Sequence, residues 1–343
     1  MTLSRRDFAS FMAAALAGAA VPGALAAAFR PSLPAPLEGA VRASARSAQE
    51  TYFQWSEVRP GVRVASGGGG NTILYLGRTG ALQSDGKNFG LGRTLRREAE
   101  SFGVPVTQLV NTHHHGDHSG GNEGFSDLPR LAHVNALPRI RASVEASLEG
   151  ARDRLGGMLE QMEAGDPAQA DVEAMLTELD GITPEDFTPD RTFEGEAELS
   201  VDGRPVECRW VSRGHTDGDN FLYLPQANVL HCGDLFFHGR HPYVDDTAGA
   251  TPAGWIRCVD AMLDLCDGDT VVVPGHGEVT DRAGLVGQKA YFQALQGMVE
   301  QALAEGRSKD EVMALEAPEL VALAGSDRHL PRNLGIVYDE MMG

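Results

Sequence analysis

Residues 111–122 of the chain read NTHHHGDHSGGN and hold four candidate metal ligands within six positions. The four are His113, His115, Asp117 and His118. Imidazole and carboxylate groups together suit Zn²⁺ or a similar first-row ion. The residues before this stretch, 106–110, form a short β-prone run of sequence VTQLV. The ligands are therefore expected in the loop at the carboxyl end of a strand.

Three further candidate ligands each follow a short apolar run later in the chain. They are His215 in RGHTDGDN, Asp234 in LHCGDLFF and His276 in PGHGE. The runs before them cover residues 206–211, 228–231 and 270–273. Ligands thus recur at similar loop positions, as expected when several loops converge on one site that holds two metal ions.

The order of these motifs, HxHxDH, GHT, GD and PGHG, resembles that of the metallo-β-lactamase-fold hydrolases over about residues 56–285. The resemblance implies an α/β fold, an αββα four-layer sandwich with a helical insertion and C-terminal helices. It also implies a first metal held by His113, His115 and His215, a second held by Asp117, His118 and His276, and Asp234 bridging both. A closed zinc site that serves only stability is the disfavoured alternative, because such sites usually have four ligands, often thiolates, and no open position.

The chemistry that the resemblance implies is hydrolysis. Two Zn²⁺ ions per chain, with iron or manganese as alternatives, would activate a bridging hydroxide that Asp117, the expected catalytic residue, helps to orient. The hydroxide would attack an ester, lactone, thioester, amide or lactam bond of a small-molecule substrate. The stretches CGDLFFHGRHPY and DGDTVVVPGHGEVTDRAGL look most like an exported zinc-hydrolase branch called cyclase-like or quinoprotein-relay-associated.

Other functions stay open for the same ligands. A true metallo-β-lactamase is one, although those enzymes usually lack an aspartate at the position of Asp234. An iron-dependent oxidoreductase is another, but the flavodiiron type is disfavoured because His115 stands where glutamate is expected. A third is a non-catalytic periplasmic metal-binding protein. Cys232 is a less favoured ligand, and buried free thiols are expected for the four cysteines.

Residues outside the ligand set are expected to orient the ligands and the substrate. Asp85 and Thr216 are candidates for hydrogen bonds to the ligand histidines, although Thr216 equally suits a turn. His241 and Tyr243, in HGRHPYVDDTAG, are candidates for substrate binding. The glycine run 67–70 is interpreted as a hairpin turn, because it lacks the lysine of a P-loop and the spacing of a dinucleotide-binding motif.

The chain opens MTLSRRDFASFMAAALAGAAVPGALAAA, which resembles a twin-arginine export signal. We expect cleavage after Ala26 and a periplasmic or exported protein. The apolar run after Arg6 is shorter than a spanning helix needs, so no stable membrane anchor is expected. A formal net charge of −19 argues against nucleic-acid partners, because an acidic surface repels phosphate backbones. The oligomeric state stays open.

The predicted domain organisation follows from composition and periodicity. Residues 27–55 form an N-terminal arm, 56–285 the metallo-β-lactamase-fold domain, and 286–343 a C-terminal helical extension. A charged insertion over 138–187 shows apolar residues at helical spacing, which favours helices that pack on the sandwich over a substrate lid. Ser308-Lys309-Asp310-Glu311 predicts a capping box at the start of a helix in the extension.

Overall fold

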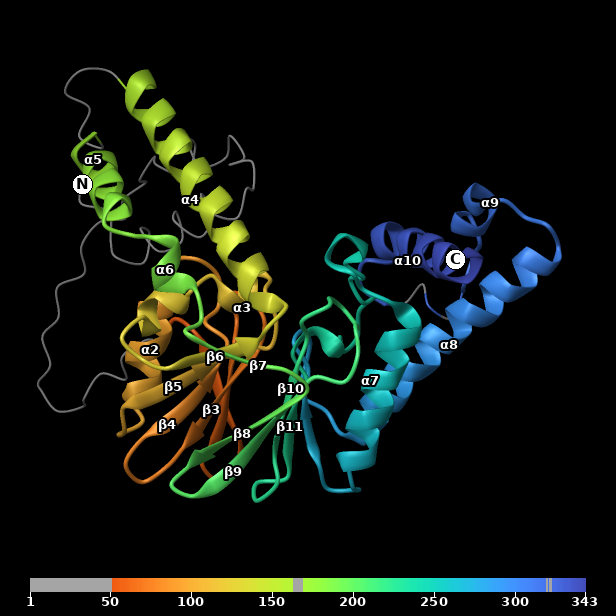
Figure 1. Ribbon diagram of the computed structural model, residues 1–343, viewed down its shortest axis with the longest axis horizontal. Coiled ribbons are helices and arrows are strands. Elements are labelled where there is room, and N and C mark those ends of the chain that lie inside the picture. Colours follow the sequence, from red (N-terminus) through yellow and green to blue (C-terminus); the bar gives the residue numbers. More distant parts are fainter. Residues whose placement is uncertain (1–50, 163–168, 319, 321–322) are drawn as a thin grey trace, which may run out of the picture.

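The computed structural model describes residues 51–162, 169–318, 320 and 323–343 (Figure 1). The export-signal prediction and nearly all of the predicted N-terminal arm, residues 1–50, lie outside the described residues.

The first sheet has seven strands that lie in sequence order. They are β1 (Gln54–Arg59), β2 (Val62–Ser66), β3 (Thr72–Leu76), β4 (Ala81–Ser84), β5 (Val106–Val110), β6 (Arg130–His133) and β7 (Arg191–Phe193). The first four are joined antiparallel, and β4 to β7 run parallel. The strand predicted over Val106–Val110 is confirmed as β5, and its parallel neighbours point their carboxyl ends to the same edge.

The second sheet has five strands in the order β12-β11-β10-β9-β8. They are β8 (Glu196–Val201), β9 (Arg204–Arg209), β10 (Phe221–Leu224), β11 (Val229–His231) and β12 (Val271–Val273). Only β11 and β12 pair in parallel. The predicted apolar runs before the later ligands are thus confirmed as β9, β11 and β12, each shorter than the run or offset from it by one or two residues.

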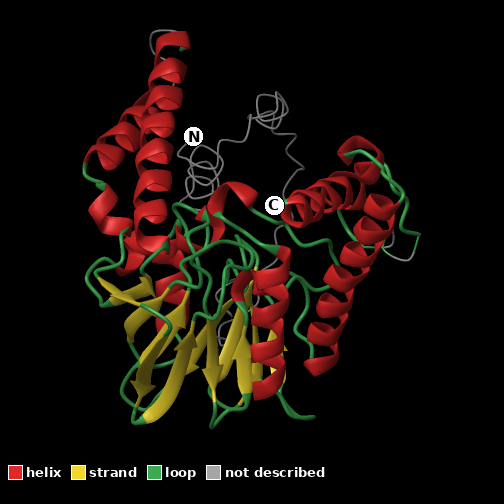
Figure 2. Cartoon of the chain, turned by 45° about the vertical axis from the view of Figure 1, so that its right-hand side comes forward, coloured by secondary structure: helices red, strands yellow, loops and turns green. Residues whose placement is uncertain are grey.

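The two sheets pack face to face with helices outside, which confirms the αββα sandwich (Figures 1 and 2). Between the sheets, Val64 and Ile73 of the first share one apolar cluster with Leu222 and Val273 of the second. Helix α2 (Gly92–Glu100) covers the outer face of the first sheet through Leu95. Helices α7 (Pro252–Leu265) and α8 (Arg282–Ala304) cover the outer face of the second sheet.

The insertion after β6 forms helices with a small core of their own. They are α4 (Ala136–Gln161), α5 (Gln169–Asp180) and α6 (Pro184–Phe187). The predicted helical spacing is confirmed, because Ile140, Val144 and Leu148 are buried on one face of α4 and pack with Phe187. This cluster also includes Phe89 of the main domain, so the insertion packs on the sandwich.

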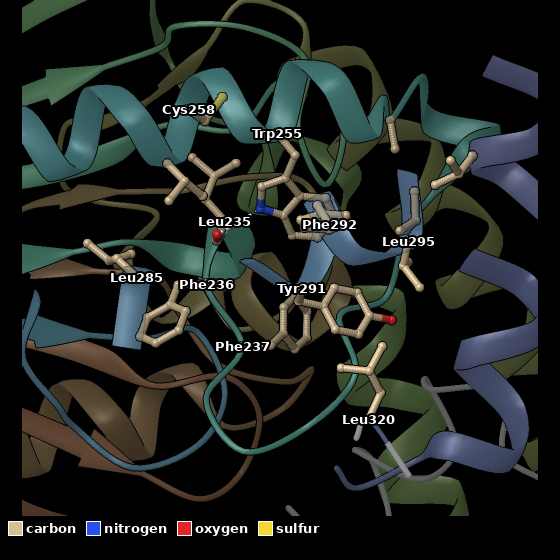
Figure 3. Packing of buried hydrophobic residues seen from close by; sticks show 14 of the residues in the cluster. Leu235, Phe236, Phe237, Trp255, Cys258, Leu285, Tyr291, Phe292, Leu295 and Leu320 are labelled. Atoms are coloured by element: carbon tan, nitrogen blue, oxygen red, sulfur yellow. Dashed lines mark hydrogen bonds between the residues drawn. The ribbon is translucent and has the colours of Figure 1, made fainter. Parts of the chain in front are cut away.

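The C-terminal extension packs against the second sheet's helical layer. Helices α9 (Lys309–Met313) and α10 (Ser326–Met342) follow α8, and Ser308 and Glu311 form the predicted capping box. Trp255 and Phe292 meet at the centre of this layer, with ring centroids 4.8 Å apart (Figure 3). Among the helices that the structure describes, none combines the length and the apolar character that crossing a membrane requires.

Candidate metal centre

The ligand loops converge where the carboxyl ends of the strands meet between the two sheets. The loop after β5 enters the short helix α3 (Gly116–Ser119), which carries Asp117 and His118. His215 follows β9, and Asp234 lies in a single 3₁₀ turn after β11. Two hydrogen bonds to the Leu235 carbonyl oxygen fix this turn. Trp255 Nε1 donates one at 2.8 Å (Figure 3), and Gln288 Nε2 donates the other at 2.7 Å.

One ligand group matches the expected first metal site. Its members are His113, His115, His215 and Asp234, whose ligand atoms all lie within 4.8 Å of one another. Nε2 of His215 lies 2.9 Å from Nδ1 of His115 and 3.4 Å from Oδ2 of Asp234. The His113 side chain contributes Nε2, at 3.8 Å from the same carboxylate oxygen. Three imidazoles and one carboxylate thus face a common point.

A second group matches the other expected site and comprises Asp117, His118 and His276. Nε2 of His276 lies 3.1 Å from Oδ2 of Asp117, and Nε2 of His118 lies 3.7 Å from it. Asp234 joins the two groups, since its Oδ1 is 3.1 Å from Nε2 of His118 and its Oδ2 is 3.4 Å from Nε2 of His276. The structure therefore brings together all seven ligands predicted from the sequence.

The chemistry of these atoms fits a bound cation. His113 Nε2, His118 Nε2 and Asp234 Oδ1 are buried and have no hydrogen-bond partner among the residues that the structure describes. Buried polar atoms are nearly always paired, because an unpaired one loses its hydration without compensation. Metal ions held by both groups would satisfy these three atoms at once.

Burial and charge shift the histidine pKa values in opposite directions. Burial lowers the pKa of His113, and that of His215 to about 3. Burial opposes protonation of His118 and His276 too, but the Asp234 and Asp117 carboxylates, joined by Asp85 at His118, together outweigh it and raise both pKa values, to about 9 for His276. Without metal, His113 and His215 are therefore neutral at pH 7, whereas His118 and His276 must release protons when a cation binds.

Asp85 forms a hydrogen bond to a histidine of the second group. It follows β4, and its Oδ2 lies 2.9 Å from Nδ1 of His118. The same carboxylate accepts hydrogen bonds from the amide and the hydroxyl of Thr112, both at 2.8 Å. These contacts orient the His118 ring so that its Nε2 faces the metal position, as the sequence interpretation of Asp85 expects.

Asp245 supports the first group, and sequence reasoning missed it. Its Oδ2 lies 2.9 Å from Nε2 of His115, so this ring has a carboxylate on one nitrogen and the metal position on the other. His114 also approaches this pair with a ligand atom within 4.8 Å. The only sequence signal was a pair of acidic residues in HPYVDDTAG, 130 positions from His115.

The other predicted supporting residues differ in position. Thr216 bonds to Asp219 through both its amide and its hydroxyl, which is the turn role left open from the sequence. Tyr243 lies beside the site, with its ring centroid 5.9 Å from those of both His115 and His215. By contrast, His241 is buried, and its ring nitrogens lie 2.9 Å from the Tyr291 hydroxyl and 3.1 Å from a backbone oxygen. This geometry favours a structural role for His241.

A cavity of about 520 Å³ opens beside the second group. His276 forms part of its wall, and Arg240, Asn71 and the glycine run supply other parts. The Arg240 side chain makes no hydrogen bond or ion pair with the described part of the chain. Within the described residues the Arg240 guanidinium is thus unpaired, and it lies in the wall that His276 also lines.

Comparison with known proteins agrees with this geometry. The sequence model described as the Metallo-beta-lactamase superfamily matches residues 90–276, more than half of the chain. The Metallo-beta-lactamase type 2 of Bacillus cereus is 29% identical over 135 residues, which are 39% of this chain and 51% of that protein. The Hydroxyacylglutathione hydrolase of a Synechococcus species is 29% identical over 183 residues, covering 52% of this chain and 53% of that protein. The chain spans about half the length of these relatives.

Solved structures share the fold. A metallo-beta-lactamase from Pontibacter korlensis superposes with a TM-score of 0.52 at 18% identity, over 70% of this chain and 99% of that one. The DIM-1 metallo-beta-lactamase superposes with a TM-score of 0.51 at 18% identity, over 71% and 97%. At this identity the likeness establishes the architecture.

Proposed function

The chain belongs to the metallo-β-lactamase superfamily of metal-dependent hydrolases, and from this membership we propose that it is a two-zinc hydrolase of small acyl compounds. The observation that carries the proposal is the position of Asp234. Its two carboxylate oxygens face different ligand groups, Oδ1 toward His118 and Oδ2 toward His215. A shared carboxylate of this kind suits two cations held a few ångströms apart.

Different residues of the site would have different roles in hydrolysis. Two bound zinc ions would supply Lewis acidity and a water that ionises near neutral pH. Asp117 uses Oδ2 toward His276 and His118, while its side chain remains 32% exposed. We assign its other oxygen, Oδ1, to accept a hydrogen bond from the attacking water and to hold that water's orientation. Burial of His113, His118 and His215 excludes bulk water from the ligand side.

The cavity beside His276 supports a substrate with one anionic group. Among its lining residues, all within the described ranges, Arg240 carries the only permanent positive charge. The wall also carries the Glu278 carboxylate, and its remaining polar groups, such as Ser56, Ser66 and Asn71, suit neutral hydrogen-bonding parts of a small molecule. We assign Arg240 as the anchor of a carboxylate or similar group on the acyl substrate.

One experiment tests the function directly. Protein purified without added metal is subjected to elemental analysis, and hydrolysis of nitrocefin, a lactone and a thioester is followed in parallel. We expect two zinc equivalents per chain and turnover of at least one substrate. A folded sample that holds no transition metal contradicts the proposal. Two bound ions without any turnover indicate a metal-binding protein, and oxygen uptake without hydrolysis indicates an iron oxidoreductase.

A true metallo-β-lactamase is the second candidate. The type 2 enzyme of Bacillus cereus among the relatives and the shared fold favour it. Preferential hydrolysis of nitrocefin over the lactone and the thioester would support this candidate.

A further inference from the structure

The glycine run 67–70, which joins β2 to β3, lies directly against the second ligand group. The Gly70 amide donates to the Asp117 carbonyl oxygen at 3.1 Å. A Cβ added to Gly70 would lie 2.2 Å from the His118 ring, and one added to Gly69 would lie 2.4 Å from the Asp117 oxygen. Glycine is therefore required here by close approach to two ligands, in addition to forming the hairpin turn.

The next residue ties the same run to the third ligand of this group. The Asn71 amide donates to the Gly275 carbonyl oxygen at 2.7 Å, and Asn71 Nδ2 donates to the Gly277 carbonyl oxygen at 2.8 Å. Gly275 and Gly277 flank His276. The run thus bridges the loop of Asp117 and His118 to the loop of His276.

Lys87 holds this run from the interior. Its side chain is fully buried, and Nζ donates to the carbonyl oxygens of Ala65 and Gly70, at 2.7 and 2.5 Å. No carboxylate of the described ranges lies within ion-pair distance of Nζ. Buried lysines are rare and usually paired, so two backbone carbonyls are an unusual environment for one.

The backbone of Lys87 is attached to the same region. Its carbonyl oxygen accepts a hydrogen bond from the Gly121 amide at 2.9 Å, just beyond α3. Its φ of +71° is a conformation that side chains other than glycine seldom adopt. The strained backbone and the buried side chain both indicate that the surrounding structure holds Lys87 in this conformation.

We propose that Lys87 is a positioning residue for the second metal ion: its hydrogen bonds hold the glycine run against Asp117 and His118. The proposal rests on the two-metal function above. It differs from a purely structural role, in which Lys87 only fills space beside Phe53 and its loss weakens the whole fold equally.

The test is stepwise binding of Co²⁺ to the metal-free protein, followed by calorimetry and visible absorption. Lys87→Met keeps the length of the side chain but donates no hydrogen bond. We expect the variant to bind one equivalent as the wild type does and to bind the other at least tenfold more weakly. The weakened equivalent must be the one that His276→Ala removes. Equal binding of both equivalents, or equal weakening of both, overturns the proposal.

Two controls bracket this result. Lys289→Met removes a surface lysine that pairs with Asp260, and Gly287→Ala adds a Cβ that meets nothing within 4 Å. Both should bind two equivalents like the wild type. If the wild type itself binds fewer than two equivalents, the result contradicts the proposed two-metal function as well as the role of Lys87.

A measurement on the unmodified protein covers the case in which Lys87→Met does not fold. Coupling between two sites is reciprocal, so a metal ion that the glycine run helps to hold must in turn stabilise the run. Hydrogen exchange of the Gly70 amide should slow when the equivalent that His276→Ala removes is bound. Binding of the other equivalent should leave the exchange rate unchanged. Unchanged exchange through both steps overturns the proposal.

Discussion

Nε2 of His115 lies 2.9 Å from Oδ2 of Asp245, while Nδ1 of the same ring lies 2.9 Å from Nε2 of His215. A carboxylate that accepts a hydrogen bond from Nε2–H fixes the tautomer and leaves the Nδ1 lone pair free for a metal ion. The first metal site thus depends on a residue that no ligand motif contains.

Replacing Asp245 by alanine should therefore weaken the first metal ion without removing a ligand. Lost partners of this kind typically cost about 10–100-fold in metal affinity. Competition with a chelator during zinc binding would measure the change. The neighbouring Asp246→Ala, which loses only a surface pair with Arg332, is the control and should leave affinity unchanged. Equal affinities in the two variants would contradict the role of Asp245.

Asp85 makes the stability of the metal-free protein depend on pH. Burial alone would raise the pKa of this carboxyl group, but the charges and hydrogen bonds of His118 and His231 together outweigh burial and lower the pKa to about 2. Because the folded pKa is below the unfolded value of about 3.9, the stabilisation is present above pH 4 and is lost as pH falls toward 2. Asp85→Asn should remove about 2 kcal/mol at pH 7 and flatten this dependence.

Urea unfolding from pH 2.5 to 7 with a chelator present would measure the effect. Asp260→Asn, which loses a surface pair with Lys289, is a suitable control. A wild-type dependence retained in full by Asp85→Asn would show that other carboxyl groups carry it.

Asp234→Asn tests the bridging carboxylate. The amide keeps the shape of the side chain but loses the charge that faces both ligand groups. We expect one of the two ions to be lost on dialysis, with its affinity reduced by more than the roughly 100-fold upper value for supporting residues. Elemental analysis after dialysis would measure this. Two ions retained per chain would indicate that each group holds its cation without a shared ligand.

The seven candidate ligands could be predicted from the sequence because each lies in a short motif after an apolar run. His113 and its neighbours are only a few positions apart, and the strand before them, β5, has the predicted bounds. Short strands such as β4 and β10, with four residues each, have too few positions to show a period. Edge strand β8 alternates in exposure but carries charged residues that resemble a loop.

Supporting residues were harder to predict, because their roles depend on contacts between distant segments. Asp245 reaches His115 only after the two sheets have packed together. The imidazole of His241 has the chemistry of a substrate contact, but only the fold shows that Tyr291 occupies one of its nitrogens. Lys87 belongs to the same class, since a sequence pattern does not distinguish a buried lysine from an exposed one.

Export by the twin-arginine route remains a proposal about residues 1–26, which lie outside the described part of the chain. It predicts that periplasmic protein begins at Ala27. Replacing Arg5 and Arg6 by lysine should retain the protein in the cytoplasm with Met1 or its immediate successor as the first residue. N-terminal sequencing of both fractions would check this. An intact amino terminus in periplasmic material would contradict the cleavage.

Arg240 provides the sharpest test of substrate class. A charge-assisted hydrogen bond is worth about 1.5–3 kcal/mol, so Arg240→Met should raise KM about 10–100-fold for a substrate with a carboxylate. The turnover number should change little, because Arg240 lies in the cavity wall and outside both ligand groups. For a neutral ester of the same substrate, Arg240→Met should leave KM unchanged. As a control, Arg282→Met changes a residue that does not line the cavity and should give the wild-type KM for both substrates. If KM rises equally for the charged and the neutral substrate, Arg240 shapes the cavity and does not bind an anion.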